Sequence, residues 1–134
     1  MISQVELLKQ AFMMIVGSKV CPKTPIRDWV KILLFTHKKG YLYAQCDDNK
    51  LNMVACMYKV SELTKKNEDV YPEKEKGNIL YIPFFVSKSK DKLLANKIFK
   101  NYIAQHPEIK EIAFYERGDD TKLRRFKRKG VKHG

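Results

Sequence analysis

The chain has 134 residues, 44% of them hydrophobic and 11% aromatic, and a formal net charge of +12. This length suits one domain, residues 1–134, and the apolar content excludes a disordered chain. No stretch reaches the ~18 apolar residues of a membrane-spanning helix. The three cysteines match no metal spacing and no basic-first signal peptide is visible, so we expect reduced thiols, no metal and a cytoplasmic protein.

Two helices are predicted at the start of the chain. The first covers residues 2–16, with Ser3 as its N-cap and an apolar second half that should be buried. The second has Thr24 as N-cap and Pro25 at its first position, and it ends at Gly40. The predicted buried stripe of this helix consists of Ile26, Trp29, Val30, Leu33, Leu34 and His37.

A β-hairpin should follow these helices. Residues 41–46 and 51–60 are rich in apolar and aromatic side chains, and the Asp-Asp-Asn-Lys sequence between them tolerates the left-handed backbone of a tight turn. The next segment, residues 61–77, is polar and mixed in charge. We interpret it as a loop and as the best candidate for a mobile flap.

The centre of the chain predicts a β-α-β unit. Residues 79–86 form a dense apolar run of strand-forming side chains. Pro83 within it cannot donate a ladder hydrogen bond, so it marks a bulge or a point where pairing stops. A helix over residues 90–105 and a strand over residues 111–116 follow. The two strands should be parallel neighbours, or should separate after a parallel start.

The loop between the first strand of this unit and its helix is basic. Backbone N–H groups and the helix dipole both favour an anion at such a position. Lys88, Lys90 and Lys92 add positive charge there. A solvated helix start explains the same lysines equally well.

The last segment carries more than half of the excess positive charge. We expect a short basic helix over residues 122–129, followed by a tail to residue 134. Its candidate polyanion-binding residues are Lys122, Arg124, Arg125, Lys127 and Arg128. Nucleic acid, an acidic protein or a phosphate-bearing ligand would each suit these cations, and a solvated cationic end remains the alternative. The element order predicts an α+β fold with a central mixed sheet and helices on its faces.

The order of elements over residues 25–131 resembles the GNAT fold of the GCN5-related N-acetyltransferases. The IRDW start of the second helix and the IPFFVSKSKDKLL block are also similar to short phage GNAT-like proteins and to toxin-activating lysine acyltransferases. The resemblance implies a GNAT-like sheet without the family's C-terminal hairpin. Either a strand added from a second chain replaces this hairpin, or the acceptor side of the site is open. It also implies a protein of a host cytoplasm, or of a virion if it is phage-encoded.

For cofactors, the resemblance implies acetyl-CoA or another acyl-CoA held along the strand before the basic loop. The residues that it assigns to this role are Phe85, Val86, Lys88, Lys90, Lys92, Leu93 and Leu94. The backbone amides of Phe85 and Val86 would polarise the thioester carbonyl, and the loop would hold the pyrophosphate. Neither glycine of the family's loop signature is present here, so this chain lacks the residues that let the backbone approach a phosphate closely.

For catalysis, the resemblance implies an amine acceptor at the end of the last predicted strand. Glu116 is the candidate general base, with a surface carboxylate paired to a nearby cation as the alternative. Alignment on Gly130 puts Phe126 where the family has its tyrosine acid, and Phe126 cannot donate a proton. Tyr115 is the candidate acid in its place, or an ordinary rim tyrosine.

Two functions from different classes follow. The first is an acyl-CoA-dependent N-acyltransferase or its catalytically degenerate descendant. The second is a non-catalytic virion or nucleoprotein component that uses its basic face to bind nucleic acid or a protein partner, by contacts that weaken with salt.

Overall fold

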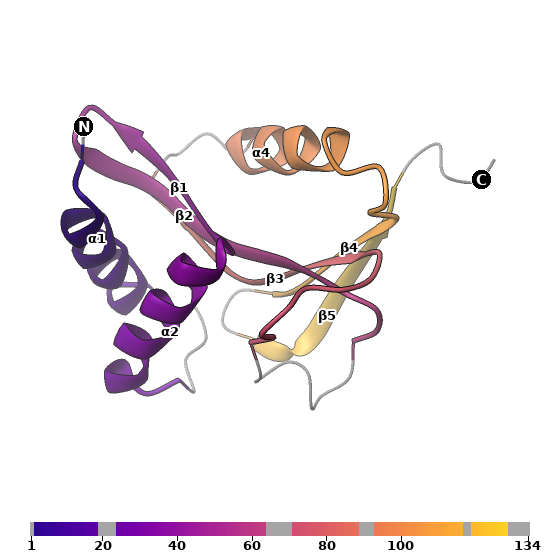
Figure 1. The fold of residues 1–134 in the computed structure, drawn as a ribbon, viewed down its shortest axis with the longest axis horizontal. Coiled ribbons are helices and arrows are strands. Elements are labelled where there is room, and N and C mark those ends of the chain that lie inside the picture. The colour runs from indigo at the N-terminus through magenta and orange to yellow at the C-terminus, as the bar shows by residue number, and fades with distance from the viewer. Residues whose placement is uncertain (1, 19–23, 64–70, 89–92, 117–118, 129–134) are drawn as a thin grey trace.

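The computed structural model describes residues 2–18, 24–63, 71–88, 93–116 and 119–128. Along the chain, a pair of helices is followed by an antiparallel hairpin, a β-α-β unit and a last strand (Figure 1). In chain order they are α1 (Gln4–Val16), α2 (Ile26–Lys39), β1 (Leu42–Asp47), β2 (Lys50–Val60), β3 (Ile79–Ser87), α4 (Leu93–Ala104), β4 (Glu111–Glu116) and β5 (Asp119–Lys127). No helix in these described ranges is long and apolar enough to cross a membrane.

One five-stranded sheet forms the middle layer, with its strands in sequence order. Only β3 and β4 run parallel; the other neighbours are antiparallel. Figure 1 shows α1 and α2 against one face of the sheet and α4 against the other. The larger core cluster joins the sheet to α1 and α2, and a smaller one joins it to α4. This confirms the predicted α+β fold with a mixed sheet and helices on both faces.

The two N-terminal helices form where expected, but they bury fewer apolar side chains than expected. Ser3 caps α1 by accepting a hydrogen bond from the Glu6 N–H at 3.1 Å. Pro25, not Thr24, is the N-cap of α2, and no side chain caps that helix. The prediction of a wide buried stripe on α2 is wrong, because α2 buries Trp29, Leu33 and Thr36. Three of the predicted stripe residues, Ile26, Val30 and Leu34, are exposed.

The hairpin and the central strands match their predicted positions closely. Asp48 in the β1–β2 turn has a φ of 58°, the left-handed geometry that the turn residues predicted. The strand β2 is the longest, and it pairs with β1 on one side and β3 on the other. Most of β2 is buried, because helices cover both faces of the sheet around it.

The last element differs from the prediction. Residues 119–127 form the strand β5, paired antiparallel with β4, so the predicted basic helix is wrong. Leu123 packs into the larger core cluster, and Phe126 stacks on Phe114 with ring centroids 5.8 Å apart. A helix over the same residues would leave β4 as an uncovered edge, whereas the hairpin satisfies its backbone groups.

Candidate functional site

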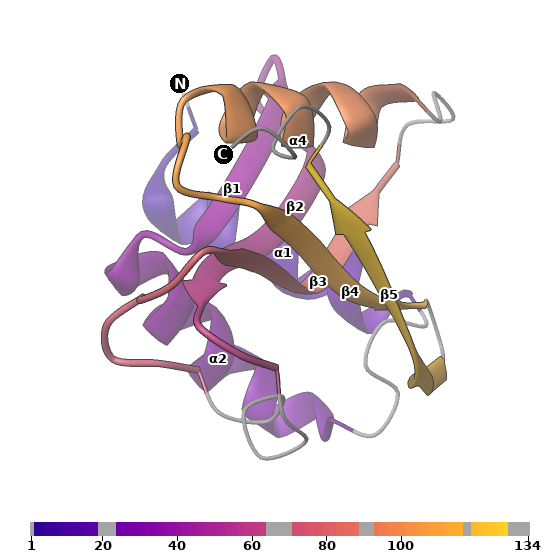
Figure 2. The same ribbon diagram turned by 90° about the vertical axis from the view of Figure 1, so that its right-hand side faces the viewer.

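A bulge interrupts β3 in the middle of the sheet. In the β2–β3 register, Tyr81 lies opposite Tyr58 and Phe84 lies opposite Cys56. Two residues of β3, Ile82 and Pro83, therefore face the single residue Met57 of β2 (Figure 2 shows these strands). Proline suits this position because it has no N–H to leave unpaired. The structure confirms the predicted bulge at Pro83.

The parallel pairing of β3 with β4 ends at the same point. It covers four residue pairs, from Ile79 with Glu111 to Ile82 with Phe114. Beyond these pairs, residues 83–87 of β3 do not pair with residues 115–116 of β4. In Figure 2 the carboxyl end of β3 turns away from β4. We call these diverging ends the β3–β4 splay; it confirms the predicted parallel start followed by separation.

Hydrogen bonding to β2 decides which backbone groups face the splay. The Lys88 N–H donates to the Asn52 carbonyl at 2.8 Å, and Ser87 lies opposite Met53. Hydrogen-bonded pairs alternate along an antiparallel ladder, so the Val86 amide faces β2. The Phe85 amide faces the other way, towards the splay. Of the two amides predicted to polarise a carbonyl, only that of Phe85 is directed to this space.

Aromatic contacts on both faces hold the splayed end of β3 in place. Phe84 meets Trp29 of α2 edge to face, with ring centroids 5.1 Å apart. Phe85 on the opposite face packs against Phe99 of α4, with centroids 5.6 Å apart. A strand without a neighbour on one side is usually mobile, but these rings fix its position. The Phe85 amide is therefore presented by a rigid segment.

A row of tyrosines leads from the splay across the sheet. Tyr115 contacts Tyr81 edge to face at 6.5 Å between ring centroids, Tyr81 contacts Tyr58 at 5.7 Å, and Tyr58 stacks on Tyr41 at 5.2 Å. Burial raises the pKa of Tyr58 well above its ordinary value. Tyr58 is consequently a neutral phenol at physiological pH. Half-buried Tyr115 stands at the splay end of this row.

The remaining predicted site residues divide into those that the structure describes and those that it does not. Lys88 is exposed beside the end of β3. Lys90 and Lys92 lie outside the described residues. Leu93 and Leu94 open α4, and Glu116 closes β4, but their side chains are outside the described part of the chain. The assignments of all these residues to a cofactor or to catalysis stay predictions.

The basic residues near the C-terminus do not form one patch. Side chains alternate along β5, so neighbouring cations point to opposite faces of the hairpin. Arg125 forms two hydrogen bonds to Glu111, at 2.5 and 3.0 Å, and these raise the pKa of its guanidinium. Arg128 donates to the carbonyls of His106 and Ile109, both at 3.2 Å. Both arginines thus have structural partners within the chain.

Of the other three predicted polyanion residues, Lys127 and Arg124 are exposed, and Arg124 has a contact of its own. The side chain of Lys122 is outside the described part of the chain. The structure therefore offers scattered cations here, and their binding role stays a prediction. The described residues contain no group of His, Cys, Asp or Glu side chains able to hold a metal ion.

Sequence reasoning missed the residues that shape the splay from either face. Tyr81, Trp29 and Phe99 supply its aromatic supports, and Met57 sits opposite the bulge. A signal for Tyr81 was present, because it is two residues before Pro83 in the strand that carries the bulge. The contacts of Trp29 and Phe99 with β3 had no local signal, since they depend on how the helices pack.

Comparison with known proteins finds a similar fold among solved structures. No protein-family model matches the sequence, and no curated protein matches it. Among solved structures, the GphF GNAT-like decarboxylase in complex with isobutyryl-CoA matches with a TM-score of 0.59 at 6% sequence identity. The match covers 84% of this chain and 62% of that protein, so this chain spans less than two thirds of its length. The chain has a GNAT-like fold.

Proposed function

We propose that this protein binds an acyl-CoA at the β3–β4 splay and transfers the acyl group to an amine. The observation that carries the proposal is the coincidence of three features: the bulge at Pro83, the end of β3–β4 pairing at Ile82, and an outward-facing Phe85 amide. Together they leave the Phe85 N–H directed away from β2 and unpaired with β4, so that a backbone donor is present where the thioester carbonyl would bind. The structural neighbour with isobutyryl-CoA supports an acyl-CoA as the ligand class.

The Phe85 N–H is the group that would act on the thioester. An amide held rigidly and directed at the carbonyl oxygen stabilises the negative charge that develops there during attack. No conformational reorganisation is then needed at the moment of reaction. The start of α4, which follows the splayed end of β3, has the polarity that favours the pyrophosphate, and exposed Lys88 would add charge.

In the proposed reaction the amine nitrogen attacks the thioester carbonyl carbon. The C–N bond forms, the C–S bond breaks, and CoA leaves as its thiolate. Glu116 or a water molecule would take the proton from the amine, and Tyr115 would protonate the thiolate. Tyr115 is assigned this role because it is a half-buried phenol at the splay end of the tyrosine row.

Binding is tested first, by isothermal titration with acetyl-CoA and isobutyryl-CoA. Lys88→Glu reverses a charge beside the splay, and Lys127→Glu reverses a charge at the start of β4, the opposite end of the strand. We expect Lys88→Glu to weaken acyl-CoA binding about tenfold and Lys127→Glu to leave it unchanged. No binding of either thioester at millimolar concentration would refute the proposal.

The same two variants test the rival function. If the protein binds nucleic acid through its basic C-terminal residues, Lys127→Glu should weaken binding of a DNA duplex and reduce its salt dependence. A salt-sensitive interaction with DNA, combined with no response to acyl-CoA, would identify a non-catalytic binding module instead.

The reaction itself is tested by release of free thiol from acetyl-CoA with a panel of amines. Tyr115→Phe should preserve binding and slow turnover by a factor of about 10²–10⁴, the usual contribution of a general acid. Malonyl-CoA without an amine is the second substrate, because the structural neighbour is a decarboxylase. Loss of CO₂ from malonyl-CoA without acyl transfer to any amine would support acyl-CoA as the ligand class. It would also show that the reaction is decarboxylation and not N-acyl transfer.

A further inference from the structure

Apolar side chains are exposed in one region of the molecule. Seven large hydrophobic side chains in the described residues are exposed, and six of them lie on α1 and α2. These six are Val5, Met13, Val16, Ile26, Val30 and Leu34. Isolated exposed apolar residues are ordinary, so we assign an interaction surface only where they line a groove between the helices, which is the case for Val30 and Leu34 and not for the other four.

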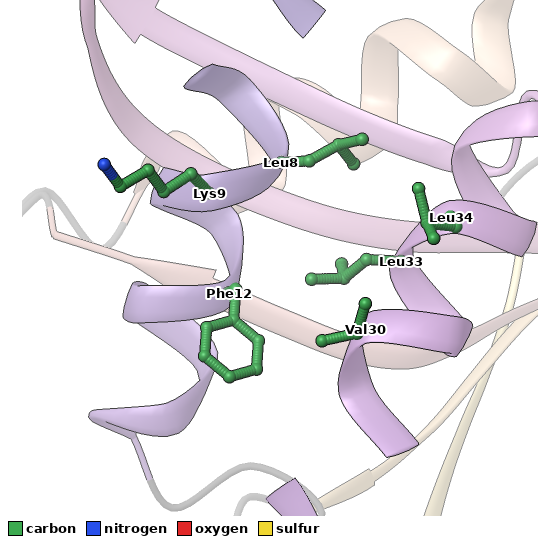
Figure 3. A pocket seen from close by; sticks show the side chains of 6 residues that line it. All are labelled: Leu8, Lys9, Phe12, Val30, Leu33 and Leu34. Atoms are coloured by element: carbon green, nitrogen blue, oxygen red, sulfur yellow. The ribbon is translucent and has the colours of Figure 1, made fainter. Parts of the chain in front are cut away.

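The two helices enclose an apolar groove. Leu8 and Phe12 of α1 face Val30, Leu33 and Leu34 of α2 across a cavity of about 240 Å³ (Figure 3). This volume is below the range of typical small-molecule pockets, roughly 300–1,000 Å³. It suits one or two inserted side chains better than a cofactor. None of the groove residues belongs to the β3–β4 splay.

The surroundings of the groove are basic. Lys9 extends outward from α1 in Figure 3, and Arg27, Lys31 and Lys38 are exposed on α2 at helical spacing from Val30 and Leu34. Each of these helices has one acidic residue, and Glu6 and Asp28 offset the charges of Lys9 and Arg27, so the excess positive charge comes from Lys31 and Lys38. Glu6 accepts a hydrogen bond from Gln10, and Asp28 lies 4.0 Å from Arg27. The groove thus combines an apolar floor with a positively charged rim.

We propose that this groove binds an acidic amphipathic helix of a partner protein. Such a helix places apolar side chains at positions i, i+4 and i+7 into the cavity and keeps its carboxylates against the basic rim. A second copy of this chain fits less well, because a two-fold contact brings the same lysines face to face. A membrane surface also fits less well, since the apolar floor is recessed between the helices.

The probe for this proposal is a fluorescein-labelled 18-residue peptide with leucines at i, i+4 and i+7 and mainly glutamates elsewhere. A matched peptide has lysines in place of the glutamates. Fluorescence anisotropy should show the acidic peptide binding at least about tenfold more tightly, and the difference should shrink as salt is raised. Equal affinities, or no binding of the acidic peptide at 1 mM, would overturn the proposal.

Two substitutions of the same kind locate the binding site. Val30→Gln changes a groove residue that is 51% exposed, and Val5→Gln changes a valine on α1 that is 78% exposed and does not line the cavity. Neither residue is buried, so both variants should fold. We expect Val30→Gln to weaken peptide binding about tenfold and Val5→Gln to have little effect. Equal effects of the two would refute the groove as the site.

A charge change and two further probes complete the test. Lys31→Glu should weaken the acidic peptide and strengthen the basic one. Sedimentation velocity then asks whether the groove mediates a dimer that Val30→Gln dissociates. Flotation with vesicles of phosphatidylglycerol and phosphatidylcholine asks whether it binds an anionic membrane. A dimer that depends on Val30 would show that a second copy of the chain occupies the groove. Vesicle binding stronger than peptide binding would show that the groove binds a membrane. Either result would overturn the proposal of a partner helix.

Discussion

The two halves of β3 differ although they belong to one strand of nine residues. Residues 79–81 pair with β2 on one side and β4 on the other, Ile82 in the bulge pairs with β4, and all four are buried. Residues 83–87 pair with β2 only, and buried Phe84 and Val86 alternate with half-buried Phe85. Pro83 stands at the border. The first half lies inside the sheet, while the second half has one backbone edge that is unpaired with β4.

This difference shows how a bulge at a single proline divides a continuous strand into a part paired on both sides and a part paired on one side. A central strand normally uses all of its backbone groups in the sheet. The bulge at Pro83 moves the following residues out of register with β4 and leaves the Phe85 amide directed at the splay. The contacts of Phe84 and Phe85 with Trp29 and Phe99 then replace the support that a neighbouring strand would give.

The largest effect is expected just before the buried half. Gly77 has a φ of 113°, and a Cβ there would overlap the backbone of Val60. We expect Gly77→Ala to lower the free energy of unfolding by at least about 4 kcal/mol, measured by urea denaturation. Gly40→Ala is the matched control, because Gly40 has a φ of 79° with open space around it; about 1 kcal/mol is expected. Equal costs would contradict the proposed steric cause.

Truncation of core side chains compares the two halves directly. Leu80→Ala removes a fully buried side chain from the first half and should lower the free energy of unfolding by about 3 kcal/mol. Phe85→Ala in the second half should lower it by only roughly 1–2 kcal/mol, since that ring is half-buried. Chemical denaturation of both variants measures the difference. A greater cost at Phe85 would mean that the second half is also a main element of the core.

Substitutions that remove or introduce a proline test where the boundary between the two halves of β3 lies. Pro83→Ala restores an N–H at the bulge and should change the free energy of unfolding by less than about 1 kcal/mol. Ile82→Pro removes an N–H from the last residue that is paired with β4 and should cost about 3 kcal/mol or more. If the two exchanges had the same effect in thermal unfolding, the border would lie elsewhere.

The smallest effect concerns pH at the paired end of β3 and β4. The pKa of Glu108 lies below its ordinary value, because its carboxylate accepts a backbone hydrogen bond and one from Lys59 at 3.1 Å. A lowered pKa in the folded state contributes stability above about pH 4.3, and this contribution disappears as the pH falls through the lowered pKa. The Tm of Glu108→Gln should therefore decline less than that of the wild type between pH 6 and pH 3. An identical decline in the two proteins would show that this ion pair contributes nothing.

Most of the helices and strands, with their approximate ends, follow from local patterns of residues. Apolar periodicity, a serine cap on the first helix, a turn rich in Asp and Asn, and a proline in an apolar run all act locally. They gave the two helices, the hairpin, β3 with its bulge at Pro83, and β4. They also indicated the parallel start of β3 and β4, because a helix between two strands allows a parallel pair.

Contacts between segments that are distant in the sequence determine which side of α2 is buried and which secondary structure the last segment adopts. The burial of Trp29 and the exposure of Val30 depend on where α1 and the sheet meet α2, and an apolar pattern contains no such information. Residues 119–127 are compatible with a basic helix when taken alone. They form a strand because the edge of β4 supplies hydrogen-bond partners and Phe114 supplies a ring for Phe126, and both lie outside the segment itself.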